Sequence, residues 1–243
     1  MIWLAVLALG LGAGTLSGIV GFGASIMLMP ALMLAFGPLE AVPIMAIAGL
    51  MANFSRVAVW WREVDWRANA YYCVTAIPAA ALGARTLLIL EPRIVEGILG
   101  ALFLAMIPAR RWLLAQGLRV KAWHLTLVGA GIGFLSGMVA STGPINTPFF
   151  IAYGLVKGAY LSTEALGSMA ISMTKAIVFQ RFDALPLETV ARGLVVGATL
   201  MIGSRLAKGF VLRLDASQFR LLMDCLLVGA GLVLLWGAVV LPH

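Results

Sequence analysis

Apolar residues occur along this chain in long stretches, separated by short polar or glycine-containing segments. Long apolar runs with few charges are typical of membrane-spanning helices. The stretches follow the order long, short, long, long, long, and this order then repeats. Their approximate bounds are 2–20, 24–36, 41–61, 67–90 and 94–115, and then 122–139, 144–156, 160–180, 187–210 and 217–241. The pattern predicts an all-α polytopic membrane protein.

The composition argues against a soluble domain. Of the 243 residues, 62% are hydrophobic and 11% are charged, and the mean hydropathy is +1.03. A soluble domain of this length could not hide so much apolar surface from water. The formal net charge of +7 would indicate a nucleic-acid partner in a soluble protein. Here the Lys and Arg residues lie in connecting segments, where they set the orientation in the bilayer, so we expect no nucleic-acid partner.

A glycine-rich motif occurs once in each half of the chain. "GLGAGTLSGIV" at 10–20 matches "GAGIGFLSGMV" at 129–139, with an offset of 119 residues. Because a repeat of this kind implies two copies of one structural unit, we predict two transmembrane repeats, residues 1–119 and residues 120–243. Each would contain about five helical segments.

The distribution of basic residues predicts that the two repeats are inverted. The segment 110–121 is the most basic and should be cytoplasmic, and the basic segment 205–213 should be cytoplasmic too. An even number of crossings must separate them, so the short stretch counts as a crossing and each half has five. Five is odd, so the halves face opposite ways and both termini lie outside. Arg85 and Arg93 would then also lie outside, against the rule.

Each half contains one segment that is too short for an ordinary spanning helix. Thirteen helical residues cover about 20 Å, less than the roughly 30 Å of a hydrocarbon core. Broken helices at corresponding places in two inverted halves are typical of secondary transporters. Their free N–H groups and positive dipole ends suit an anion. The candidate anion-binding residues at these two helix starts are Gly21, Gly23, Ser141, Thr142, Gly143 and Asn146. Alternatively, the glycines only allow close helix packing.

Two cations in otherwise apolar stretches coincide under the same offset. Arg56 aligns with Lys175, and their polar neighbours align as well. A cation at mid-membrane costs on the order of 2.5–3.5 kcal/mol on insertion scales, so it needs a reason. Helical side chains lean toward the N-terminus of their helix, which here leads into the bilayer. We therefore predict an anion site formed by Arg56, Lys175, Asn53, Ser172 and Thr174. The alternatives are that the cations reach the membrane interface or form a buried ion pair.

Two carboxylates are candidates for a counter-ion or for proton coupling. Glu164 lies near the start of the stretch 160–180, and Asp224 lies within the last stretch. Either could pair with a cation or carry a proton.

The motifs resemble those of the sulfite exporter TauE/SafE family of membrane permeases. "GLGAGTLSGIVGFGASIMLMPAL" and "GFLSGMVASTGPINTPFFIAYGL" are similar to the family's glycine-rich segment, which occurs in both halves, and "WWREVDW" at 60–66 is similar to its basic–Val-Asp-Trp ending. The usual Gly-x-Gly-Gly-Gly is changed in both copies, and Arg56 and Lys175 stand where many relatives would have small or neutral residues. The resemblance implies a carrier of sulfite, an organosulfonate or another sulfur-containing anion.

The sequence thus predicts a secondary transporter in the cell (inner) membrane, an exporter by resemblance, that works by alternating access around a cationic site between the repeats. Its partners would be a small anion, the lipid bilayer and, for coupling, protons. The alternative is a structural or assembly subunit with no transport of its own. Catalysis is not expected, because no pair of carboxylates or histidines has catalytic spacing. Cys73 and Cys225 lie in separate apolar stretches, without Cys-x-x-Cys spacing. We expect both in the core, with no metal or cofactor.

Overall fold

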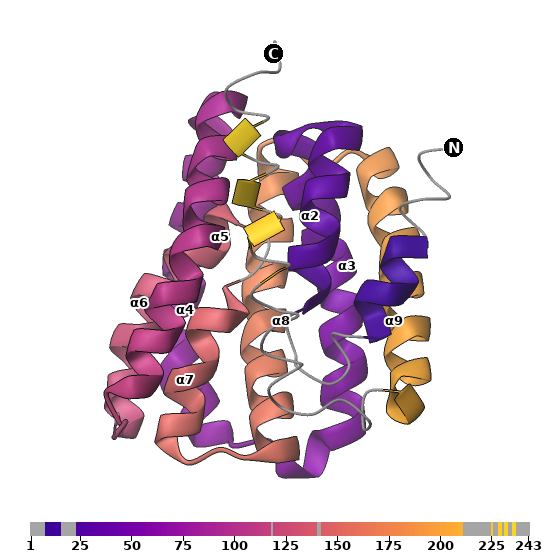
Figure 1. Cartoon of the computed structure of the whole chain (residues 1–243). Coiled ribbons are helices and arrows are strands. Elements are labelled where there is room, and N and C mark those ends of the chain that lie inside the picture. Colours follow the sequence, from indigo (N-terminus) through magenta and orange to yellow (C-terminus); the bar gives the residue numbers. More distant parts are fainter. Residues whose placement is uncertain are drawn as a thin grey trace.

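A computed structural model describes residues 8–15, 23–117, 119–139 and 142–210, together with a few residues between 225 and 236. The described part is helical and contains no strand (Figure 1). Residues 8–15 form a helical segment. The helices that follow are α2 (Gly23–Phe36), α3 (Pro38–Trp60), the short 3-10 helix η1 (Trp61–Glu63), α4 (Trp66–Ile89), α5 (Pro92–Ala115), α6 (Ala122–Met138), α7 (Gly143–Tyr153), α8 (Lys157–Arg181) and α9 (Leu187–Phe210).

Helix boundaries recur at the offset that the glycine motif defines. α3 begins at Pro38 and α8 begins at Lys157, which are 119 positions apart. Gly23 and Gly143, which begin α2 and α7, are 120 positions apart. The order of a short helix followed by two long ones is therefore common to both halves. The inverted relation of the halves stays a prediction, as do the boundaries 1–119 and 120–243.

The long helices of the two halves pack against each other. In Figure 1 α3 and α8 run side by side through the middle of the bundle, and α3 also packs on α9. On the other side, α4 packs on α6 and on α8. Helices of the first half thus form interfaces mainly with helices of the second half, and the space between α3 and α8 lies where the halves meet.

The repeated glycines make these interfaces close. On α6, Gly133 lies against the backbone of Ala76 of α4, and Gly137 lies against that of Ala80. In the first half, Gly14 lies against the backbone of Leu200 of α9. Small residues let helix backbones approach each other, so close packing explains these three glycines of the motif, whereas nothing lies within 4 Å of a Cβ built at Gly12 or Gly131.

The short helices end where the sequence breaks them. α2 has 14 residues and α7 has 11, so they are about 21 Å and 17 Å long at 1.5 Å per residue. α7 carries a proline in its first turn and ends at Gly154, whose φ of 111° favours glycine. α2 is followed by Gly37 with a φ of 77°. Both helices are shorter than the hydrocarbon core of a bilayer, which is about 30 Å thick.

The segment 60–66, which resembles the family's basic–Val-Asp-Trp ending, connects α3 to α4. Asp65 accepts a hydrogen bond from the backbone N–H of Ala68 at 2.8 Å and so caps the start of α4. The backbone N–H of Asp65 donates to Oγ1 of Thr163 at 2.9 Å. This turn therefore ties α4 to the second turn of α8 and fixes the height of α8 in the bundle.

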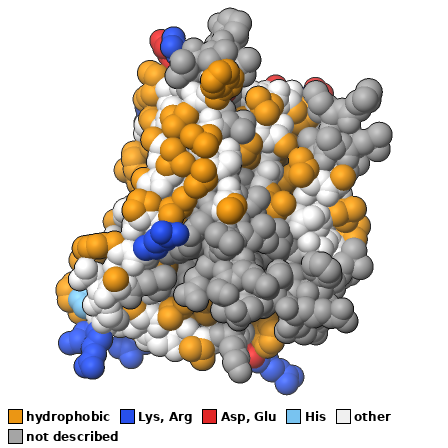
Figure 2. All heavy atoms as spheres, viewed as in Figure 1, with side chains coloured by type: hydrophobic (Ala, Val, Ile, Leu, Met, Phe, Trp, Pro, Cys, Tyr) orange, Lys and Arg blue, Asp and Glu red, His pale blue; other side chains and the backbone are white. Residues whose placement is uncertain are grey.

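The described surface is largely apolar along the sides and charged at the ends. Figure 2 shows hydrophobic side chains along the length of the helices and Lys and Arg side chains gathered mainly at the lower end. Exposed large side chains include Leu34, Val74, Leu82 and Leu127. Two described helical segments, Leu39–Glu63 and Trp66–Ile89, are long and apolar enough to cross a membrane. A continuous exposed apolar surface fits contact with lipid.

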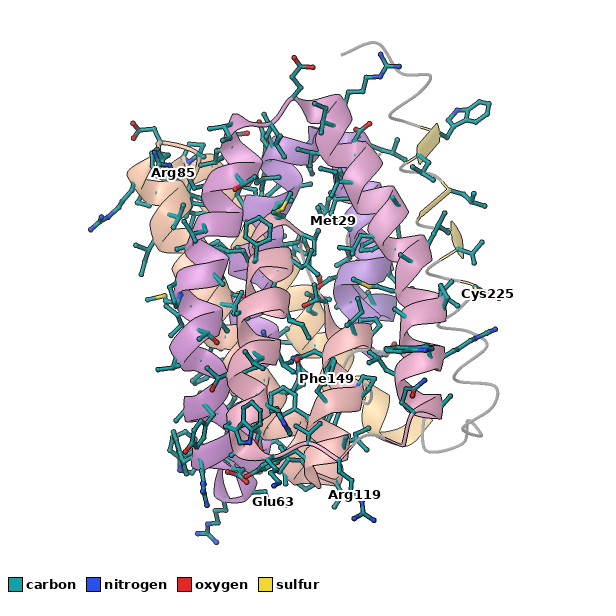
Figure 3. All side chains as sticks on the ribbon, turned by 90° about the vertical axis from the view of Figure 1, so that its left-hand side faces the viewer. Met29, Glu63, Arg85, Arg119, Phe149 and Cys225 are labelled. Atoms are coloured by element: carbon teal, nitrogen blue, oxygen red, sulfur yellow. The ribbon has the colours of Figure 1, made fainter. Side chains whose placement is uncertain are left out.

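The orientation predicted from charge places the segment 110–121 and Arg85 on opposite sides of the membrane. Glu63 and Arg119 lie at one end, and Arg85 lies at the other (Figure 3). The side of the membrane that each end faces stays a prediction.

The expectation that both cysteines lie in the core is wrong for Cys225, which is exposed, while Cys73 is half-buried. Lipid is as apolar as a protein interior, so an apolar stretch does not tell which face of its helix is buried.

The contact between α4 and α6 can be tested with two neighbouring glycines. In Gly133→Ala the new Cβ would lie 2.6 Å from the Cα of Ala76, and a backbone atom cannot move aside as a side-chain end can. We expect the variant to lose about 1–3 kcal/mol of stability, as overpacked interiors do. Gly131→Ala on the same helix is the control, because nothing lies within 4 Å of its Cβ. Thermal unfolding in detergent should show a lower midpoint for Gly133→Ala alone. Equal midpoints would contradict this packing.

Candidate functional site

A polar cavity of about 50 Å³ lies between the helices of the two halves. Residues from α2, α3, α4, α6, α7, α8 and α9 line it, so most of the described bundle contributes. The polar residues of its lining are Ser25, Asn53, Arg56, Tyr72, Ser136, Thr142, Asn146, Glu164, Ser168, Ser172 and Lys175. Polar groups gathered inside an otherwise apolar bundle are costly, which makes this cavity the candidate binding site.

The two central helices face the cavity with the same register positions. The lining residues of α3 and α8 are spaced as on one face of a helix, and each residue of α3 has a counterpart 119 positions later. The pairs are Met45 and Glu164, Gly49 and Ser168, Ala52 and Ile171, Asn53 and Ser172, and Arg56 and Lys175. The cavity is therefore built by equivalent faces of the two halves, and a carboxylate is present on only one of them.

Arg56 lies on the buried face of α3, one turn before the end of the helix. Its residue exposure is 8%. Nη1 donates to Oε2 of Glu164 at 3.0 Å, and Nη2 donates to Oδ1 of Asn53. The buried Nε–H has no hydrogen-bond partner among the described residues. A buried donor without an acceptor costs about 1–3 kcal/mol, so this guanidinium still has a position for one more acceptor.

Glu164 is the partner of Arg56 and is 3% exposed. While Oε2 accepts from Arg56, Oε1 accepts from the hydroxyl of Ser168 at 2.6 Å, one turn further along α8. Both carboxylate oxygens therefore have donors, and a charge-assisted hydrogen bond holds the ion pair inside the bundle.

Lys175 is 1% exposed and binds the end of α6. Its ammonium group donates to the carbonyl oxygens of Ser136 at 3.0 Å and of Val139 at 3.1 Å. Carbonyls in the last turn of a helix lack partners within the helix, and a cation there is favoured by the helix dipole. Lys175 thus joins α8 to the point where α6 ends, and two of its three N–H groups are used.

The break between α6 and α7 borders the cavity. The hydroxyl groups of Ser136 and Thr142 are hydrogen-bonded across it. The first turn of α7 presents Gly143 and Asn146 to the cavity. Oδ1 of Asn146 is buried without a partner among the described residues. A helix N-terminus that faces a polar cavity favours negative charge.

The structure brings most of the predicted site residues together. Those that line the cavity are Arg56, Lys175, Asn53, Ser172, Thr142, Gly143, Asn146 and the coupling candidate Glu164. Gly23 begins α2, and its neighbours Ala24 and Ser25 line the cavity. Gly21, Ser141 and Asp224 lie outside the described residues. Their roles in binding or coupling stay predictions.

The predicted site residue Thr174 is not among the described residues that line the cavity. Its hydroxyl donates instead to the carbonyl of Ala170 at 2.8 Å, one turn earlier on α8. A residue directly before Lys175 lies about 100° away around a helix with 3.6 residues per turn, which is the physical reason.

The structure distinguishes an interfacial position of Arg56 and Lys175 from a buried one. Both side chains are buried, so the interpretation that they reach the membrane interface does not describe this structure. A buried ion pair does describe Arg56, which binds Glu164. Lys175 binds backbone carbonyls instead.

Four polar lining residues were missed by the sequence reasoning: Ser25, Tyr72, Ser136 and Ser168. Ser168 could have been found, because it follows Glu164 by four residues and so shares its helix face. For Tyr72 the repeat gives no signal, since Ala191 stands 119 positions later.

Comparison with known proteins places this cavity in a family context. The family model described as "Sulfite exporter TauE/SafE" matches residues 6–234, which include every lining residue of the cavity. A protein of Sinorhizobium fredii named "Probable membrane transporter protein y4hK" is 29% identical over 221 residues, which cover 83% of this chain and 85% of that protein. No solved structure is significantly similar to the chain.

Because the Arg56–Glu164 pair is buried, removing one partner should destabilise the protein more than removing both. Arg56→Met should cost about 3–5 kcal/mol, because it leaves the buried Glu164 charge without compensation. Adding Glu164→Gln to Arg56→Met should recover most of that loss.

The control is Arg192, which pairs with Glu40 near the surface. Arg192→Met should cost at most about 1 kcal/mol, as exposed pairs do. Thermal unfolding of the purified variants in detergent measures all three. A double variant as unstable as Arg56→Met alone would show that the pair is not the cause.

Proposed function

The chain belongs to the sulfite exporter TauE/SafE family, and we propose that it carries a small sulfur-containing anion across the membrane through the cavity between α3, α7 and α8. The Sinorhizobium relative is named as a probable membrane transporter. We place the protein in the cell (inner) membrane as a multi-pass carrier. The apolar exposed surface supports a membrane location, and the family description supports export as the direction.

The observation that carries this proposal is the pair of buried cations in one cavity. Arg56 and Lys175 occupy equivalent positions of the two halves and line the same polar space. Each buried cation is costly in a membrane, so two of them in one cavity need a reason. A site that binds an anion gives both cations a function. The unpartnered Nε–H of Arg56 supports this, since a substrate oxygen would supply its missing acceptor.

The charges around the cavity favour a negatively charged ion. Among the described lining residues the charged ones are Arg56, Lys175 and Glu164, which leaves one positive charge in excess while Glu164 is ionised. If Glu164 takes up a proton, the excess rises to two positive charges, so the lining favours an anion in either state. Hydrogen-bonding side chains such as Asn53 and Ser172 would orient its oxygens.

The size of the cavity favours a compact ion. A single water needs about 10–15 Å³ of such volume, so a cavity of about 50 Å³ holds on the order of four groups of that size. Sulfite, a sulfur atom with three oxygens, is of this size. Sulfoacetate adds a methylene and a carboxylate and exceeds it. We therefore propose sulfite as the preferred substrate, ahead of organosulfonates.

Access from the two sides of the membrane would alternate around this cavity. The cavity lies where α3 of one half meets α8 of the other, so a rocking of one half against the other would open it to each side in turn. The N-terminal turn of α7 would add backbone donors to the bound anion.

The second candidate function is a structural or assembly subunit without transport. It is favoured by the Arg56–Glu164 pair, in which a buried cation already has an internal counter-ion. A subunit of that kind would lose stability when the pair is broken but would move no anion. Flux measurements on stable variants separate the two functions.

We expect protein in liposomes to move sulfite faster than sulfoacetate, taurine, sulfate or chloride. Lys175→Met and the double variant Arg56→Met with Glu164→Gln should each reduce sulfite flux by about tenfold or more, because a hydrogen bond to a charged group contributes about 1.5–3 kcal/mol. Flux is measured per amount of monodisperse protein, so that loss of folded material is not counted as loss of transport.

Arg62→Met and Arg181→Met are the matched controls. These arginines are also related by the 119-residue offset but are exposed, so their flux should stay close to that of the wild type. If the wild type moves none of the five compounds, the transport proposal fails and the assembly subunit is favoured. If Lys175→Met moves sulfite as fast as the controls, the cationic site is wrong.

A further inference from the structure

We propose that Glu164 couples transport to protons. Glu164 binds Arg56 when no anion is present, and it takes up a proton when the anion binds Arg56 in its place. This inference rests on the proposed transport of a small anion and names the group that would couple it. A proton and an anion would then cross the membrane together.

The geometry makes Glu164 a substitute for the substrate. Its Oε2 accepts from Nη1 of Arg56, and a carboxylate presents oxygens to a guanidinium much as an oxyanion of sulfur does. The bound anion would meet the same nitrogen and the free Nε–H beside it. Glu164 and the anion are therefore competitors for one cation.

The repeat does not place a carboxylate at this position in both halves. The equivalent residue of the other half is Met45, which lines the same cavity from α3. An apolar residue thus fills the corresponding position in a helix of matching register. The acidic side chain is the difference between these two equivalent positions, and it lies where it can bind Arg56, which favours a functional role for it.

The surroundings of Glu164 determine how its charge responds to an anion. Arg56 of α3 binds it, and Tyr72 of α4 and Tyr160 of α8 lie close enough to interact with it electrostatically. Lys175 lines the same cavity but binds carbonyls of α6.

Within the part of the chain that the structure describes, the other elements that pack on α8 bring no further charge to the cavity. α6 and α7 contribute Ser136 and Asn146 to the lining, and neither titrates. The carboxylate of Glu63 in η1 lies against Gly158 instead, which is six residues before Glu164 on α8 and so about 9 Å away along the axis. Arg56 is therefore the single opposite charge that binds Glu164 among the described residues.

The exchange can be written as one proton transfer. On the open side, an O–H bond forms between a carboxylate oxygen of Glu164 and a proton from water, and the ion pair with Arg56 breaks. An oxygen of the anion then accepts from Arg56. On the other side the anion leaves, Glu164 returns its proton to water, and the ion pair forms again. No group is oxidised or reduced, and binding of the anion and of the proton favour each other.

The test uses wild-type protein and Glu164→Gln in liposomes at zero membrane potential. With the transported ionic form of sulfite equal on both sides, a pH difference of one unit should let the wild type accumulate that form up to about tenfold, because each proton carries one anion. Vesicles without protein give the background of uncharged sulfur dioxide. Glutamine can accept the hydrogen bond of Arg56 but cannot release a proton. Glu164→Gln should therefore bring the transported ionic form of sulfite to equal concentrations on both sides, without the further accumulation of that form that the wild type shows.

Glu188→Gln is the matched control, because Glu188 also binds an arginine, Arg192, but lies on the surface. It should accumulate sulfite as the wild type does. Accumulation by Glu164→Gln equal to that of Glu188→Gln would overturn the inference while leaving transport intact. A wild type that moves no sulfite would instead overturn the transport proposal.

Ser168→Ala covers the case in which Glu164→Gln fails to fold. Ser168 donates to the ionised carboxylate and so stabilises the charged form. Without that hydrogen bond Glu164 should take up its proton more readily, so the pH dependence of sulfite flux should shift to higher pH. An unchanged pH profile would count against Glu164 as the coupling group.

Discussion

The burial of a guanidinium and a carboxylate against each other is the interaction on which the described structure depends. Arg56 and Glu164 come from different halves of the chain, and neither could stay charged inside an apolar bundle without the other. The pair fixes the register of α3 against α8, and the faces of these two helices then align residue by residue along the cavity. A single contact therefore connects the packing of the halves with the chemistry of the space between them.

The helices around this contact are of two kinds: long helices that pack closely and short helices that end inside the bundle. Glycines draw α4 and α6 together, and the helical segment 8–15 against α9, so that the outer interfaces are close. α2 and α7 are too short to cross a hydrocarbon core, and α7 begins at the cavity. Polar groups are thus concentrated where helices end inside the bundle, as unpaired backbone groups require.

Much of the fold and part of the site could be predicted from the sequence, because apolar stretches and helix register can be read from it. The face of each helix that lines the cavity could not be predicted in this way. The apolar stretches located the described helices, and the offset of 119 residues paired Arg56 with Lys175, because duplicated helices keep their register. Thr174 was included because it aligns with Ser55, yet it lies on another face of α8. Register says which residues correspond, whereas the face that meets the cavity depends on the neighbouring helices. Tyr72 and Ser25 reach the cavity from helices whose tilt no sequence pattern encodes.

The two hydrogen bonds from Lys175 to the end of α6 have a mechanical consequence. The ammonium group connects the last carbonyls of α6 to the second half of α8. Any negative ion that draws the ammonium toward itself would weaken its hydrogen bonds to Ser136 and Val139. The end of α6 would then be held less firmly when the cavity is loaded, so the same lysine would link occupancy to the freedom of that helix end.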